Sequence, residues 1–215
     1  MDGKSAYSQL HWTRIAFKLH APCLFDFPMA MHFCSNCGKP LTQEIPPLDN
    51  RLRDVCHACG SIHYENPKIV VCTIPCLKTS RGTEVLLCRR AIEPRDNYWT
   101  LPGGFMEINE TTEQAAIRET LEEATADVSL KGLFALMNLA VFQQVHLFYL
   151  ADMKEACFAP GEESREVRLF TEAEVPWDRL AFSTITHALR FFFEDEKKGI
   201  LEHGGFGVHT IDLSR

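Results

Sequence analysis

Short apolar runs, rich in β-branched and aromatic residues, recur between residues 69 and 170. They occupy residues 69–77, 84–90, 98–101, 128–150 and 167–170, with turn-forming residues between them. Apolar runs of this length that are bounded by turns predict buried strands, and the long run at 128–150 has room for two. The pattern therefore predicts a sheet at the centre of the protein. Within these runs Cys72, Cys76 and His146 are expected to pack in the core or across strands rather than to bind a ligand.

Two other segments follow a helical period. In the first, Thr111 followed three residues later by Gln114 is a capping-box pattern, which predicts a helix that starts at about Thr112. The buried side of this helix is expected to consist of Ala116, Ile117, Thr120, Leu121 and Ala124. In the second segment, residues 183–193, the apolar side chains fall on one side. Two amphipathic helices are therefore expected.

Three carboxylates of the first helix, those of Glu119, Glu122 and Glu123, share one face because they stand at positions i, i+3 and i+4. Like charges one turn apart repel by roughly 0.2–0.5 kcal/mol per pair. A bound divalent cation would offset this repulsion, and Mg²⁺ takes oxygen ligands that it shares with substrate phosphates. The alternative is a solvated acidic face, which is the more frequent meaning of such a pattern taken alone.

The neighbouring residues favour the metal-binding interpretation. Six fixed positions match the signature box of the Nudix hydrolase family, which this stretch resembles: Gly104, Glu110, Arg118, Glu119, Glu122 and Glu123. The preceding segment, residues 99–104, is also similar to the usual lead-in of that box. Thr120 stands at a bulky apolar position of the box, and Thr125 stands where the family has glycine. A β-branched residue resists the left-handed conformation of a helix end, so the resemblance does not extend to the end of this helix.

The resemblance implies an α+β fold, an α/β/α sandwich built on a mixed sheet. It also implies hydrolysis of a nucleoside diphosphate linked to another group, with Mg²⁺ or Mn²⁺ as the cofactor. The implied ligands are the carboxylates of Glu119, Glu122 and Glu123, together with the backbone carbonyl of Gly104. Arg118 is expected to brace these carboxylates, with Glu110 as its partner.

Further roles are implied outside the helix. Family members differ in where the general base lies, and Glu163 resembles a late-loop base or metal ligand of the NADH pyrophosphatase group. Glu166 is the second candidate, and the alternative is that both are solvated loop acids. Arg89 or Arg90 is expected to bind a substrate phosphate through its bidentate guanidinium, and the alternative is an ordinary surface arginine.

Four cysteines precede this region as two CxxC pairs, Cys34 with Cys37 and Cys56 with Cys59. Two such pairs are typical of a structural Zn²⁺ site with four thiolate ligands, and the alternative is four reduced, buried thiols. A module of about 35 residues cannot bury enough apolar surface to be stable alone, so the metal is expected to stabilise its fold. The nearby histidines, His57 and His63, are expected to be bystanders.

A zinc ribbon followed by a Nudix-like domain resembles a zinc-ribbon group of bacterial Nudix hydrolases related to the NADH pyrophosphatases. We accordingly expect a loose extension at 1–30, the ribbon at 31–66, the hydrolase domain at 67–196 and a loose tail at 197–215. Members of this group act on FAD and ADP-ribose, so a dinucleotide or a nucleotide sugar is the expected substrate. Residues 137–143 lack the proline-rich motif of the NADH pyrophosphatases. Hydrolysis of NADH or of NAD caps on RNA is therefore the alternative activity, and a nucleotide-sensing domain is the alternative class.

The composition of the chain limits the kinds of partner that the protein is expected to bind. A net charge of −7 argues against broad electrostatic binding of nucleic acid, and no apolar run approaches the roughly 20 residues of a membrane span. Nine cysteines, four of them in a metal-binding spacing, suit a reducing compartment and predict a cytoplasmic protein. A small nucleotide is therefore the expected partner, and the proteins that the chain resembles imply a homodimer.

Overall fold

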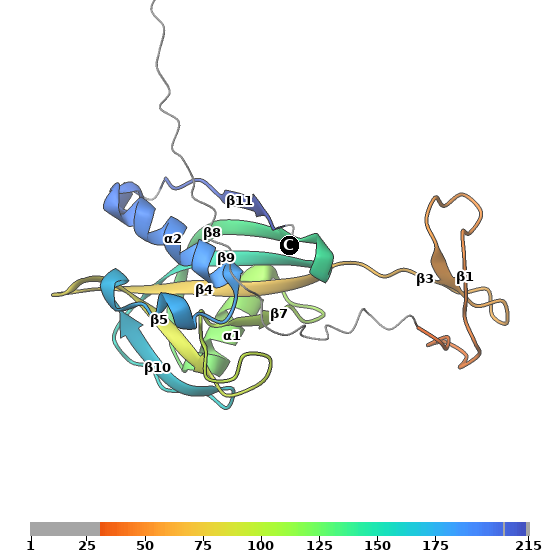
Figure 1. Cartoon of the computed structure of the whole chain (residues 1–215), viewed down its shortest axis with the longest axis horizontal. Coiled ribbons are helices and arrows are strands. Elements are labelled where there is room, and N and C mark those ends of the chain that lie inside the picture. The colour runs from red at the N-terminus through yellow and green to blue at the C-terminus, as the bar shows by residue number, and fades with distance from the viewer. Residues whose placement is uncertain (1–30, 204, 214–215) are drawn as a thin grey trace, which may run out of the picture. The chain divides into compact units, whose positions relative to one another are not determined.

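The computed structural model describes residues 31–203 and 205–213. The loose extension that we expect at residues 1–30 lies outside these described residues. The chain divides into two compact units, Met1–Tyr64 and Glu65–Arg215, and each is considered by itself (Figure 1). None of the helices in the described part has the length and apolar character that a membrane span requires.

The first unit contains a small antiparallel sheet in the order β1 (Thr42–Glu44), β2 (Arg53–Val55) and β3 (Ile62–His63). One CxxC turn precedes β1, and the other connects β2 to β3. Among the described residues of this unit, the buried apolar side chains are those of Cys34, Pro46, Val55 and Cys56. Such a core is too small to hold a module together without a further cross-link.

The second unit is built on one mixed sheet. The path through the sheet runs in the order β10 (Ser164–Phe170), β5 (Gly82–Arg90), β4 (Lys68–Thr79), β9 (Gln144–Met153), β8 (Val128–Leu139) and β11 (His209–Asp212). The short strands β6 (Trp99–Thr100) and β7 (Gly103–Phe105) pair with β5 and β4. Strands β4 and β9 are parallel, as are β8 and β11, whereas the other pairs on the path are antiparallel. The mixed sheet expected from the resemblance is therefore confirmed.

Two α-helices lie on opposite faces of this sheet, α1 (Thr112–Ala124) on one and α2 (Ser183–Lys197) on the other (Figure 1). Single turns of 3₁₀ helix complete the connections: η1 (Ala140–Phe142), η2 (Glu172–Glu174), η3 (Trp177–Arg179) and η4 (Ile200–His203). The expected α/β/α sandwich is thus confirmed. On the α2 side, the apolar stripe of the helix packs on the sheet as predicted, through Ile185, Leu189 and Phe192. Burying each such side chain contributes roughly 1.5–3 kcal/mol.

Helix α1 approaches the sheet through small residues. Ala115, Ala116 and Ala124 are completely buried. The hydroxyl of Thr120 donates to the Ala116 carbonyl at 2.7 Å and meets the hydroxyl of Thr73, on β4, at 2.6 Å. Where the box has a bulky apolar residue, this chain therefore has a buried hydrogen bond between helix and strand, which brings the two backbones close together.

The expectation that Ile117 and Leu121 belong to the buried side of α1 is wrong. Their side chains are 42% and 54% exposed. Because the helix packs through alanines and Thr120, its buried side is turned toward Glu123, which is only 7% exposed. The close approach therefore buries a carboxylate and leaves two large apolar side chains in solvent.

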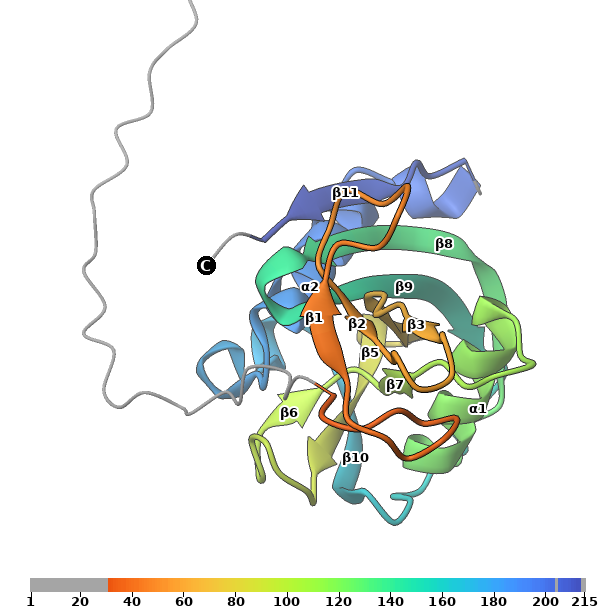
Figure 2. The same cartoon turned by 90° about the vertical axis from the view of Figure 1, so that its right-hand side faces the viewer.

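The expectation of a loose tail at 197–215 is also wrong. Helix α2 extends to Lys197, and the chain then returns to the sheet as β11, which adds to β8 as a parallel edge strand (Figure 2). His209 of β11 lies 2.8 Å from the carboxylate of Asp195 and stacks on the ring of Phe191, with ring centres 4.4 Å apart. Ladder bonds and these side-chain contacts therefore fix a segment whose glycine-rich flank indicated looseness.

Candidate active site

The capping box predicted at the start of α1 is present. Thr111 accepts a hydrogen bond from the backbone N–H of Gln114, and the Gln114 side chain accepts one from the backbone N–H of Thr111. These reciprocal bonds hold the start of the helix at Thr112. They therefore set which turns of the helix face β7 and its glycines.

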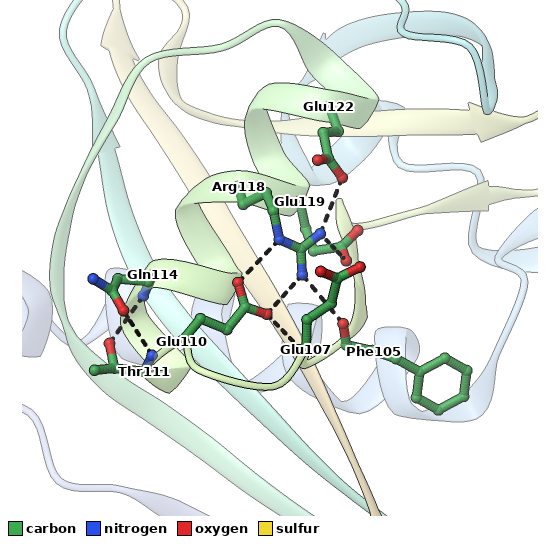
Figure 3. A network of polar contacts seen from close by, with 8 residues as sticks. All are labelled: Phe105, Glu107, Glu110, Thr111, Gln114, Arg118, Glu119 and Glu122. Carbon is green, nitrogen blue, oxygen red and sulfur yellow. Dashed lines mark hydrogen bonds and ion pairs between the residues drawn. The ribbon is translucent and has the colours of Figure 1, made fainter.

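Arg118 is the centre of a polar network on this helix (Figure 3). Its Nε and Nη2 atoms donate to the two carboxylate oxygens of Glu110 at 3.0 and 2.8 Å. Its Nη1 atom donates to Glu119 at 2.7 Å and to Glu122 at 3.0 Å. Nη2 also donates to the carbonyl of Phe105 at 3.2 Å. The guanidinium thus joins the loop after β7 to two carboxylates of the helix, and the contact expected between Arg118 and Glu110 is present.

Glu110 is held from a second side by the loop. The backbone N–H of Glu107 donates to its carboxylate at 2.6 Å. Hydrogen bonds from Arg118 and from this N–H lower the pKa of Glu110 to about 2. Glu110 is therefore an anion at any physiological pH, and it can pair with the Arg118 guanidinium throughout that range.

Two glycines let the helix carboxylates approach the backbone of β7. A Cβ atom on Gly104 would lie 2.6 Å from a carboxylate oxygen of Glu119. At Gly103 a Cβ atom would lie 2.4 Å from the carbonyl oxygen of Val71 on β4. The N–H of Gly103 donates to the carboxylate of Glu123 at 3.3 Å. Glu119 and Glu123 therefore face the backbone of β7 directly.

The two inner carboxylates are costly to charge when no cation is near. Burial raises the pKa of Glu123 to about 8, and the charges of Glu119 and Glu163 act in the same direction. Burial also raises the pKa of Glu119, against the lowering effect of Arg118. Raised carboxylate pKa values that cluster in this way are typical of functional sites, and a divalent cation would remove the penalty.

Of the two loop acids proposed from the sequence, Glu163 is the one whose negative charge acts on carboxylates of the box. It contributes to the raised pKa of both Glu119 and Glu123. Glu166 instead lies opposite Arg89 in the pairing of β10 with β5, and its carboxylate is 3.0 Å from the Arg89 guanidinium. The structure therefore brings Glu163 to the box and leaves Glu166 in an ion pair between strands.

The two arginines at the end of β5 likewise differ in whether their charge acts on the box. Arg90 donates from Nε to the carbonyl of Pro94 at 2.9 Å, and its guanidinium lies 5.3 Å from the ring centre of Phe182. Its positive charge lowers the pKa of Glu123. Arg89 is engaged by Glu166. Arg90, rather than Arg89, therefore lies within electrostatic reach of the box.

The donor set suits a hard divalent cation. The carboxylates of Glu119, Glu122, Glu123 and Glu163 and the carbonyl of Gly104 are all oxygen donors. Oxygen donors of this kind are the ligands of Mg²⁺ and Mn²⁺, whereas sites for softer metals contain thiolate or imidazole. Burial raises the pKa of the Glu123 carboxyl group despite the opposing charge of Arg90, so its anionic form gains from a further positive charge. The residues therefore fit the cation that the resemblance implies.

In the first unit, the four cysteines come together. Their Sγ atoms all lie within 4.8 Å of one another, with 3.7 Å between Cys34 and Cys59 and 3.5 Å between Cys37 and Cys56. Four thiolates at about 2.3 Å around a tetrahedral Zn²⁺ ion would be about 3.8 Å apart, so the cluster fits a structural zinc site. His63 Nε2 lies 3.3 Å from Cys34 Sγ, where a protonated nitrogen would donate to the thiolate.

Comparison with known families agrees with this geometry. The family model described as the NUDIX domain matches residues 69–203, and the zinc-ribbon model described as Nudix N-terminal matches residues 32–65. The chain therefore belongs to the Nudix hydrolase family. Within that family it is one of the members that carry the N-terminal zinc ribbon.

Individual relatives match this chain at modest sequence identity and over part of their length. The chain is 32% identical over 150 residues to the NAD-capped RNA hydrolase NudC of Pectobacterium carotovorum, covering 70% of this chain and 52% of that protein. For the NudC of Vibrio atlanticus the identity is 26% over 170 residues, covering 78% of this chain and 60% of that protein. The chain thus spans about half the length of the curated relatives that it matches.

Solved structures share the fold. A NUDIX hydrolase from Nitrosomonas europaea is 43% identical, with a TM-score of 0.78, and the match covers 86% of this chain and all of that one. The NUDIX domain of Shewanella oneidensis NrtR, solved with ADP ribose, is 21% identical with a TM-score of 0.53. That match covers 62% of this chain and 90% of the NrtR domain, and at this identity it supports the fold alone.

Sequence reasoning missed two parts of the site. The N–H of Gly103 contacts Glu123, although the box pattern begins at Gly104. The turn at Pro160 and Gly161 packs on the end of α1, where the N–H of Gly161 donates to the carbonyl of Glu123 at 3.0 Å. The Pro-Gly pair is a turn signal in the sequence, but nothing in a local pattern says which element that turn will contact.

Proposed function

We propose that the protein hydrolyses the pyrophosphate bond of a nucleoside diphosphate derivative and releases a nucleoside monophosphate, with Mg²⁺ or Mn²⁺ as cofactor. FAD, ADP-ribose and related dinucleotides or nucleotide sugars are the substrates that we favour. The observation that carries this proposal is the position of Glu119 and Glu123 against the Gly104 edge of β7, where both have raised pKa values. Membership of the Nudix family supports it.

In this proposal Glu119, Glu122, Glu123 and the carbonyl of Gly104 hold the divalent cation. When bound, such a cation offsets the charge of a pyrophosphate and activates water at neutral pH. Arg118 carries a raised pKa, chiefly because it donates to Glu110, so it stays charged and orients Glu119 and Glu122.

Glu163 is the proposed general base. Its side chain is exposed at the edge of the box, so it is accessible to an attacking water and to bulk solvent that removes the proton. Arg90 is the proposed phosphate contact, because its guanidinium is bonded through Nε to a carbonyl and presents the remaining nitrogens to an incoming anion. Arg89 is the weaker candidate, since Glu166 already neutralises it.

An aromatic ring beside the box supports a nucleotide as the substrate. Phe105 follows Gly104 directly, its side chain is 51% exposed, and Lys68 Nζ lies 5.5 Å from its ring centre. An exposed ring of this kind can stack on a flat base, and a neighbouring ammonium can contact a phosphate. We therefore place the base or the second flat ring of the substrate at Phe105.

Hydrolysis of NADH or of the NAD cap of RNA is the second candidate, and the names of the curated relatives favour it. The absence of the proline-rich motif at residues 137–143 favours the first candidate. A nucleotide-sensing domain without catalytic activity is the third candidate. Against it, every carboxylate of the box is present in this chain.

The test is a screen of the purified full-length protein with FAD, ADP-ribose, NADH and a short NAD-capped RNA at a fixed Mg²⁺ concentration. We expect AMP release from FAD or ADP-ribose that requires the cation and that Glu119→Gln lowers by about 100-fold or more. Faster cleavage of NADH or of the capped RNA than of FAD and ADP-ribose would favour the second candidate. Tight binding of a dinucleotide without turnover would favour the sensor.

A further inference from the structure

The end of α1 is capped by a loop from a distant part of the chain. The helix ends at Ala124, and Thr125 adopts the left-handed conformation (φ 50°, ψ 31°), although its side chain disfavours it. The last carbonyls of a helix have no partner within the helix. Here the carbonyl of Glu123 accepts from the N–H of Gly161 at 3.0 Å, and that of Ala124 accepts from the N–H of Ala159 at 2.9 Å.

Gly161 makes this docking sterically possible. A Cβ atom at this position would lie 1.7 Å from the carbonyl oxygen of Glu122 and 2.8 Å from its carbonyl carbon. Both are backbone atoms of the helix, so they cannot rotate aside as a side chain would. Gly161 is not among the glycines with positive φ. Its lack of a side chain, rather than its backbone freedom, is therefore what the structure needs.

The same loop carries Glu163. On one side the ring of Phe158 packs against the apolar cluster that contains Ala124. On the other side the carbonyl of Glu163 accepts from the N–H of Ala91 at 2.8 Å. The backbone of the loop is thus held at both ends, while the side chain of Glu163 is exposed.

We infer that Gly161 is a positioning residue for hydrolysis: by letting the loop pack on the backbone of Glu122 and Glu123, it sets Glu163 beside the metal-binding face of α1. This inference rests on the proposed function, in which Glu163 acts as base or ligand. It also accounts for Thr125, because the N–H groups of the loop cap the helix end where other family members use a glycine at the position of Thr125.

The test is a double-mutant cycle of Gly161→Ala and Glu163→Gln in the full-length protein, with kcat, KM and the Mg²⁺ activation constant as readouts. We expect Gly161→Ala to lower kcat by about 10–100-fold, the range found when the support of a metal ligand is removed. We expect the double variant to be no slower than Glu163→Gln alone, because Gly161 acts through Glu163. Losses that multiply would show an independent structural effect and would overturn the inference.

Matched variants separate the outcomes. Gly207→Ala is the control, because a Cβ atom there meets nothing within 4 Å, and it should leave kcat unchanged. If Gly161→Ala does not fold, Ala159→Pro replaces it in the cycle: proline lacks the N–H that caps Ala124, and its ring also fixes the backbone there and restricts Phe158. A normal kcat in Gly161→Ala, with Glu163→Gln slow, would overturn the inference and leave the proposed function standing. A normal kcat in Glu163→Gln would overturn both the inference and the role of Glu163, whereas Glu119→Gln tests the proposed function separately.

Discussion

Arg118 donates two hydrogen bonds to the carboxylate of Glu110, at 3.0 and 2.8 Å, across the turn that separates β7 from α1. The remaining terminal nitrogen of the same guanidinium reaches the box carboxylates. The Arg118 guanidinium therefore couples the position of the loop after β7 to the positions of Glu119 and Glu122 on α1. Only a guanidinium has enough donors in a fixed fork to make all of these contacts.

Arg118→Lys should therefore impair the site although it keeps the charge. We expect kcat to fall by about 10–100-fold and the Mg²⁺ activation constant to rise, because support of ligand geometry is lost. Steady-state kinetics over a range of Mg²⁺ concentrations measures both. Arg190→Lys, on the exposed side of α2, is the control. Wild-type kinetics for Arg118→Lys would show that the network does not position the carboxylates.

Stability without magnesium should depend on pH through Glu123. Burial raises its pKa from the ordinary 4.5 to about 8. A carboxyl group whose pKa is higher in the folded state stabilises the fold while it is protonated. This contribution is complete below about pH 4.5 and is lost as the pH rises through about 8.

In magnesium-free buffer the Tm should accordingly fall between pH 5.5 and pH 8.5, and it should fall less in Glu123→Gln, which cannot ionise. Added Mg²⁺ should raise the Tm of the unaltered protein most at the higher pH, because the cation replaces the proton. Differential scanning calorimetry at several pH values measures this. Parallel pH profiles for the two proteins would contradict the assignment of a buried, uncompensated carboxylate.

Thr125→Gly should stabilise the protein. The left-handed conformation of Thr125 costs a non-glycine residue about 1 kcal/mol, and glycine relieves that cost. Because glycine is also more flexible in the unfolded chain, we expect a net gain of about 0.5 kcal/mol in the free energy of unfolding by urea. Thr186→Gly, inside α2, should instead destabilise by a few tenths of a kcal/mol. A loss of stability in Thr125→Gly would mean that the threonine side chain has a role of its own.

The zinc ribbon should depend on its metal. With so few buried apolar residues, its fold requires the cross-link that Cys34, Cys37, Cys56 and Cys59 provide through Zn²⁺. We expect one zinc ion per chain by elemental analysis. In Cys56→Ser, limited proteolysis should cut within residues 32–65 while residues 69–203 stay protected. Equal protection of both regions in the variant would refute a metal-dependent ribbon.

The site was largely predictable from sequence because it is local. Helix geometry alone decides that Glu119, Glu122 and Glu123 share a face, and the capping pattern at Thr111 locates the start of that helix. Both are short-range properties that the pattern contains. The contact between Arg118 and Glu110 followed from the resemblance and is likewise made within one loop and helix.

What could not be predicted is long-range. The period of α1 shows which residues share a face, but the closeness of the helix to β4 decides that Glu123, rather than Leu121, turns inward. The pairing of β11 with β8 depends on ladder bonds between distant segments, and a four-residue strand has no period to detect. The docking of Gly161 on Glu122 is a contact of the same kind.

The most direct test is the kcat for Mg²⁺-dependent release of nucleoside monophosphate from the best substrate of the screen, in Glu119→Gln and Glu123→Gln. Both should lose activity by about 100-fold or more, because in the proposed function these carboxylates hold the cation that the reaction requires. In magnesium-free buffer at about pH 5.5, where Glu123 is protonated in the unaltered protein, their Tm values should stay close to that of the unaltered protein. Glu194→Gln, an exposed site on α2, should retain full activity. Near-normal turnover in both Glu119→Gln and Glu123→Gln would show that the acidic face of α1 does not perform the hydrolysis.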